Sequence, residues 1–286
     1  MRREDLSVHG RRAGGLVQGT GLRKGRRMRP AEEIARMLPI PADLGRGAFT
    51  GRWRSASAHI SPERMTPLKE ALLFKTNAAL YSLVSAAMVW QAERLRAQTD
   101  VSPLLDMAEA LYAWQQDWHW FGRTPAIADI DTIDEAPRPQ GSVLMMLDLI
   151  HQDHIYTSGH WPSEPIFSVT ADMLVLTRFN LPADAVPAFD AWVEAVIARM
   201  DLVAEFPEHG ETPELEVGDT PERRAWAAKV MGQPLPPSVL DLSRDPDPSR
   251  WPDEWRDLLA RLDWDGNPFL RPHPGTLRPR QDGEVP

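Results

Sequence analysis

The sequence predicts an all-α protein, a single-domain bundle of six to eight helices around a long central helix over residues 67–98. Two observations carry this prediction. Residues 76–92 contain no charge, no proline and no glycine, while charged residues flank the run on both sides. No alternation of apolar and polar residues is sustained over five positions, so no strand is expected.

The central helix is expected to begin at Pro67. Thr66 can cap a free backbone N–H, and proline is tolerated at the first helical position. A helix over residues 67–98 would be about 48 Å long. Because its middle is apolar on nearly all sides, we expect other helices to surround it.

The remaining helices follow from apolar residues at helical spacing and from prolines in the first turn. They are expected over residues 31–38, 102–121, 142–156, 166–180, 182–206, 221–231 and 251–262. Pro187 favours a start of the helix over 182–206 nearer Ala185. We expect the connections over 123–141 and 207–220 to be irregular and residues 232–250 to lie extended over the surface.

Charge divides the chain into three regions. Residues 1–29 carry nine basic residues against Glu4 and Asp5, a net charge of +7, so the remainder carries −16 of the total of −9. This Gly- and Arg-rich tail is expected to be disordered, or to precede a translation start at Met28; a basic arm for nucleic acid is the alternative. Residues 30–270 form the globular domain, and 271–286 form a mobile Pro- and Gly-rich tail.

Composition excludes several classes of protein. The acidic body argues against nucleic acid as its main partner, because phosphate binding needs a basic face. The apolar run 76–92 is shorter than the roughly twenty residues of a membrane span. With no cysteine there is no disulfide or thiolate site, and the N-terminus lacks an apolar secretory stretch. We expect a cytoplasmic protein, and the excess of arginine over lysine favours a bacterial source.

The stretch 147–160 is the best candidate for chemistry. Asp148, His151 and His154 are spaced three apart, which places them on one side of a helix, and His160 follows in the adjoining turn. Such residues can bind one zinc, iron or manganese ion, with His119 or Asp117 from a second helix completing the site. The H-x-x-H spacing is not a specific metal signature, and an amphipathic helix explains it as well. We therefore expect no cofactor, with this metal site as the alternative.

Two acidic segments are the other charged features. Residues 129–135 contain Asp129, Asp131, Asp134 and Glu135 without calcium-loop spacing, which favours a solvated loop. The second segment can face a basic partner, and surplus tryptophan suits a binding surface, although Trp114 and Trp118 are expected in the core. The predicted partner-binding residues are Glu208, Glu211, Glu214, Glu216, Asp219 and Trp120.

Known catalytic motifs are absent from the chain: there is no G-x-S-x-G, no P-loop and no dinucleotide fingerprint after a strand. Whether the chain is an enzyme therefore stays open. The leading hypothesis is binding of a macromolecular partner, for example neutralisation of a basic toxin by an immunity-type protein. The alternative is a metal-dependent helical hydrolase or oxygenase at 148–160, and a third is a homodimer formed through 76–92.

Overall fold

The computed structural model describes residues 28–47, 62–122, 130–156, 166–204 and 220–271, with the backbone alone at 62–66, 130–131 and 152–156. These parts are helical and contain no strand, which confirms the all-α prediction; a single bridge joins Phe121 to Leu270. The helices are α1 (Pro30–Met37), α2 (Pro62–Leu72), α3 (Asn77–Leu95), α4 (Ser102–Gln116), α5 (Ile130–Glu135), α6 (Arg138–Tyr156), α7 (Phe167–Asn180), α8 (Val186–Val203), α9 (Pro221–Met231) and α10 (Trp251–Leu259). Short 3-10 turns are η2 (Trp118–Trp120), η3 (Pro237–Leu240) and η4 (Pro248–Arg250).

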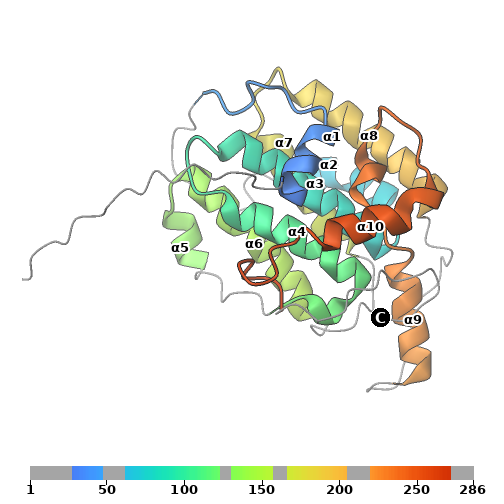
Figure 1. Ribbon diagram of the computed structural model, residues 1–286. Helices are drawn as coiled ribbons and strands as arrows, with labels where there is room; N and C mark the ends of the chain where they lie inside the picture. The colour runs from blue at the N-terminus through green and yellow to red at the C-terminus, as the bar shows by residue number, and fades with distance from the viewer. Residues whose placement is uncertain (1–27, 48–61, 123–129, 157–165, 205–219, 272–286) are drawn as a thin grey trace, which may run out of the picture.

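Helix α3 lies in the middle of the molecule, with α4 on one side and α7 on another (Figure 1). Every residue of α3 except Glu93 is buried. The prediction that other helices surround the uncharged run is therefore confirmed. Because this surface is covered by the chain itself, the proposed dimer interface through 76–92 is wrong.

The central helix is shorter than predicted, because the chain turns between α2 and α3. The N–H of Thr76 donates to the carbonyl of Ala204 at 3.1 Å, and Thr76 has extended backbone angles. Asn77 accepts a hydrogen bond from the N–H of Ile166 at 3.0 Å. These contacts with distant segments fix a break that local sequence does not signal. The predicted start was also wrong: α2 begins at Pro62, so Pro67 lies inside it.

The segment 234–240 departs most from expectation, since all seven of its residues are buried rather than extended over the surface. Its prolines have no N–H to satisfy, which lowers the cost of burying this backbone. The N–H of Leu235 donates to Oε1 of Gln115 at 3.0 Å, and Arg199 donates to the carbonyl of Val239 at 3.2 Å. Side chains of α4 and α8 thus form hydrogen bonds with backbone groups that would bond to one another in a helix.

Other elements also differ from the prediction. Helix α4 ends at Gln116 rather than at residue 121, because the carboxylate of Asp117 accepts the N–H of His119 and starts the turn η2. Helix α5 forms inside the predicted irregular connection, and α6 begins four residues early. The start of α8 next to Ala185 is confirmed.

Aromatic residues fill the core around α3. Trp90 meets the ring of Phe189 edge-on, with centroids 5.2 Å apart, and Trp114 lies 4.7 Å from Phe121. Trp114 and Trp118 are each 2% exposed, which confirms their predicted place in the core. In the described part of the chain, no helix is long and apolar enough to cross a membrane.

Candidate interaction surface

The predicted metal ligands are only partly within the described residues. Asp148 and His151 lie half-buried on α6. The side chain of His154 and the whole of His160 lie outside the described residues. His119 is exposed on η2, where its Nδ1 lies 2.9 Å from Oδ1 of Asp117.

Within the described ranges, no three His, Cys, Asp or Glu side chains lie together in a way that could hold a metal ion. Since two predicted ligands fall outside these ranges, the site around 148–160 stays a prediction. The Asp117–His119 contact has a local role, because the same carboxylate oxygen also accepts the N–H of His119 at 2.8 Å.

Of the predicted partner-binding residues, only Trp120 is described. It is half-buried, and its ring meets that of Trp264 edge-on with centroids 5.5 Å apart. Its carbonyl accepts the N–H of Arg271 at 2.9 Å. Trp120 therefore helps to fix the C-terminal segment, and only its exposed remainder is open to a partner. The acidic residues Glu208, Glu211, Glu214, Glu216 and Asp219 lie outside the described residues.

A surface that the sequence analysis did not identify lies on α8. We call it the outer face of α8. Its members are exposed apolar residues at alternating spacings of three and four, the pattern of a coiled-coil seam. They are Ala188, Ala191, Ala195, Ala198 and Leu202. Figure 1 places α8 at the periphery of the molecule, in yellow.

Leu202 is the most exposed large apolar residue on this face. This residue is 85% exposed, whereas the next two large apolar residues in the described ranges, Phe179 and Leu73, are 38% and 37% exposed. The opposite side of α8 is buried through Phe189 and Trp192 and their neighbours. Helix α8 is therefore apolar on two sides, and the described part of the chain covers only one of them.

Contacts with the rest of the chain fix α8 in place. Arg178 donates to both carboxylate oxygens of Asp190, at 2.8 Å and 3.0 Å. Lys75 forms an ion pair with Asp201. Arg199 turns away from the outer face, since its guanidinium donates to the carbonyls of Asp241 at 2.7 Å and Arg244 at 2.9 Å.

These contacts have an electrostatic consequence. With Arg199 turned inward, the exposed Glu194 gives the outer face an acidic border. The chain then continues from α8 into residues 205–219, which contain six acidic residues and one histidine but no lysine or arginine. Both features attract a cation or a basic surface.

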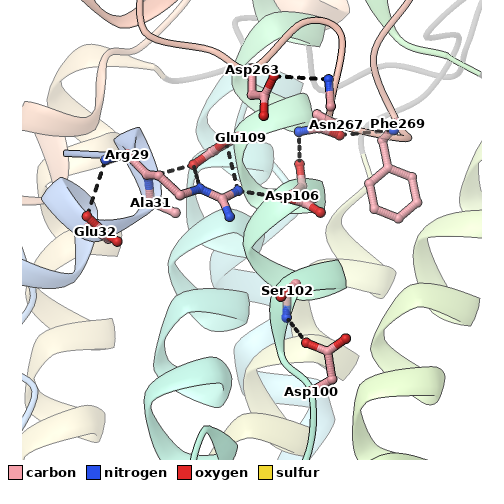
Figure 2. A network of polar contacts seen from close by, with 11 residues as sticks. Arg29, Ala31, Glu32, Asp100, Ser102, Asp106, Glu109, Asp263, Asn267 and Phe269 are labelled. Atoms are coloured by element: carbon pink, nitrogen blue, oxygen red, sulfur yellow. Dashed lines mark hydrogen bonds and ion pairs between the residues drawn. The ribbon is translucent and has the colours of Figure 1, made fainter. Parts of the chain in front are cut away.

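A second charged cluster is buried, and its geometry gives it a structural role. Arg29 donates from Nε to Glu109 at 3.0 Å and from Nη2 to Asp106 at 2.5 Å (Figure 2). Glu109 also accepts the N–H of Ala31 at 3.2 Å, and Asn267 donates to the carbonyl of Asp106 at 2.7 Å. The cluster thus joins α1, α4 and the C-terminal segment.

Burial governs the titration of this cluster. The side chain of Glu109 has no exposure, and burial raises its pKa while the hydrogen bonds from Arg29 lower it. Burial likewise raises the pKa of Asp106, opposed by the same guanidinium. Two carboxyls share one cation, so the cluster favours holding a proton more than free carboxyls do.

The chain matches no protein family model, no curated protein and no solved structure.

Proposed function

We propose that this protein acts by binding a macromolecular partner, and that the outer face of α8 is the contact surface. The exposure of Leu202 is the observation that carries the proposal. Burying a leucine side chain on a partner contributes about 1.5–3 kcal/mol. A ridge of alanines next to it lets a second helix approach closely, which extends the buried area.

The charge of the chain supports a basic partner. The acidic border at Glu194 and the acidic sequence 205–219 lie next to the apolar ridge along the chain. Such charges speed the encounter with a basic surface and reject acidic ones. Neutralisation of a basic toxin, as in immunity proteins, is one concrete form of this function.

Site-specific photo-cross-linking in the cells that produce the protein tests the proposal. A benzophenone amino acid is placed at Leu202 or Ala195, with Ala225 as an exposed control on α9. We expect one basic protein to be captured from positions 202 and 195 and not from 225. Capture with equal yield from all three positions, or from none, would contradict the proposal.

The metal-dependent enzyme stays the alternative, with Asp148, His151, His154, His160 and His119 as its ligands. Elemental analysis of protein purified without tag and chelator tests it. We expect no stoichiometric metal. About one equivalent of zinc, iron or manganese that is lost on His151→Ala would replace partner binding with the enzyme hypothesis.

A further inference from the structure

A polar pocket of about 220 Å³ is lined by residues of α1, η3 and α10 and of the segments on either side of α10. Its lining includes the apolar residues Met37, Pro237 and Leu258. Three arginines and three carboxylates line its walls. Its volume is below the roughly 300–1,000 Å³ of drug-sized sites, which limits an occupant to a group the size of an amino acid.

Four charged residues of the pocket have partners within the chain. Arg261, two residues beyond the end of α10, forms an ion pair with Glu33 of α1 at 2.5 Å. The hydroxyl of Ser238 donates to Oε2 of Glu254. Arg244 is paired with Asp241 at 3.2 Å. These contacts fix the walls of the pocket and leave Oε1 of Glu254 without a hydrogen bond to the described residues.

Two other charged residues that line the pocket have no ion-pair partner among the described residues. Arg250 and Asp257 are exposed. The guanidinium of Arg250 and the carboxylate of Asp257 form no ion pair with the described residues. They are seven residues apart along α10, about two turns and about 10 Å, so they lie on the same side of the helix. Glu254 lies between them.

These two charges oppose the dipole of α10. A cation at the N-terminal end and an anion near the C-terminal end each cost a few tenths of a kcal/mol or more. Arg250 is the N-cap of α10 and Asp257 lies in its last turn. Charges that weaken a helix and form no ion pair with the described residues are expected where a ligand compensates for them.

The order of the charges along α10 selects the class of ligand. Arg250 at one end can bind a carboxylate. Glu254 in the middle, with one oxygen already bonded to Ser238, can bind an α-ammonium group. Asp257 at the other end can bind a side-chain cation. We propose that this pocket binds a basic amino acid, free or at the C-terminus of a polypeptide. Its carboxylate would lie on Arg250, its α-nitrogen on Glu254 and its side-chain cation on Asp257, with the methylene groups over Leu258.

Calorimetric titration of the full chain with L-arginine tests this assignment, with a tetrapeptide ending in arginine as the second probe. Binding of the free amino acid identifies a metabolite site. Binding of the peptide acid alone, lost when its carboxylate is amidated, identifies the end of a polypeptide. Both results support the assignment.

Variants on α10 supply the controls. Arg250→Gln and Asp257→Asn should each weaken binding by at least about tenfold. Arg256→Gln and Asp253→Asn are the matched controls, because these residues pair with each other outside the pocket at 2.5 Å. No binding heat from either probe at about 10 mM, well above a millimolar Kd, would overturn the assignment. Unchanged affinity in Arg250→Gln and Asp257→Asn would also overturn it.

Discussion

Helices α3 and α8 are both rich in apolar residues, yet they are buried to different extents. The chain buries α3 on all sides, whereas it buries one side of α8 and leaves alanines and Leu202 in solvent. The difference lies in the arrangement of apolar residues and not in their number. In α3 the polar residues that remain are buried with it; in α8 two apolar stripes are separated by acidic and basic residues. We interpret α3 as the core of the fold and the outer face of α8 as a surface that another molecule covers.

The largest difference in the free energy of unfolding is expected between a variant that truncates a buried aromatic residue of α3 and a variant that truncates a residue on the outer face of α8. Trp90→Ala removes a fully buried side chain that packs on Phe189 and should lower the free energy of unfolding by about 3–5 kcal/mol. Leu202→Ala should change it by less than about 0.5 kcal/mol. Urea unfolding measures both. A large loss at Leu202 would mean that the chain itself buries this residue.

Removal of the cation in the buried cluster comes next. Arg29→Ala leaves Glu109 buried without its cation and should cost about 2–4 kcal/mol. Arg36→Ala, on an exposed part of the same helix, is the matched control and should be nearly neutral. Thermal unfolding of the two variants compares them, and equal midpoints would show that the cluster does not fasten α1.

Two glutamines sharpen the comparison inside the core. Neither amide atom of Gln91 on α3 has a hydrogen-bond partner among the described residues, and its side chain is fully buried. Gln91→Met should therefore stabilise the protein by about 1–2 kcal/mol. Gln115→Met should destabilise it by about 1–3 kcal/mol, because Gln115 bonds Ser82 and the backbone of Leu235. The same sign for both variants would contradict this account.

The pH dependence of stability should report Asp106 and Glu109. Their pKa values are raised in the folded state because burial outweighs the effect of Arg29. Groups with raised pKa values contribute their full stability below the pKa of the unfolded chain and lose it as the pH rises through the folded pKa. Between the ordinary carboxyl range near pH 4 and neutral pH, Glu109→Gln should make the free energy of unfolding fall less steeply than in the wild type. An unchanged slope would contradict the prediction.

The sequence was sufficient to predict the elements whose signals are local. The uncharged run of α3 and the prolines that open α4, α8 and α9 gave these helices nearly in place. The break at Thr76 and the burial of 234–240 could not be predicted, because both depend on hydrogen bonds to residues more than a hundred positions away.

The surface was harder to predict than the core. The outer face of α8 is visible in the sequence as a seven-residue repeat, but alanine is also a strong helix former on any solvated face. Only its exposure in the folded structure separates the two interpretations. The pocket on α10 could not be anticipated, since it joins α1 to residues about two hundred positions further along the chain.

Affinity for the cross-linked partner tests the central claim most directly. It is measured by titration for wild type and Leu202→Asp at low and high salt. We predict that Leu202→Asp binds at least about tenfold more weakly while its free energy of unfolding is unchanged, and that salt weakens the wild-type complex. Equal affinity of the two proteins, or affinity that does not depend on salt, would contradict a partner surface built from an apolar ridge and an acidic border.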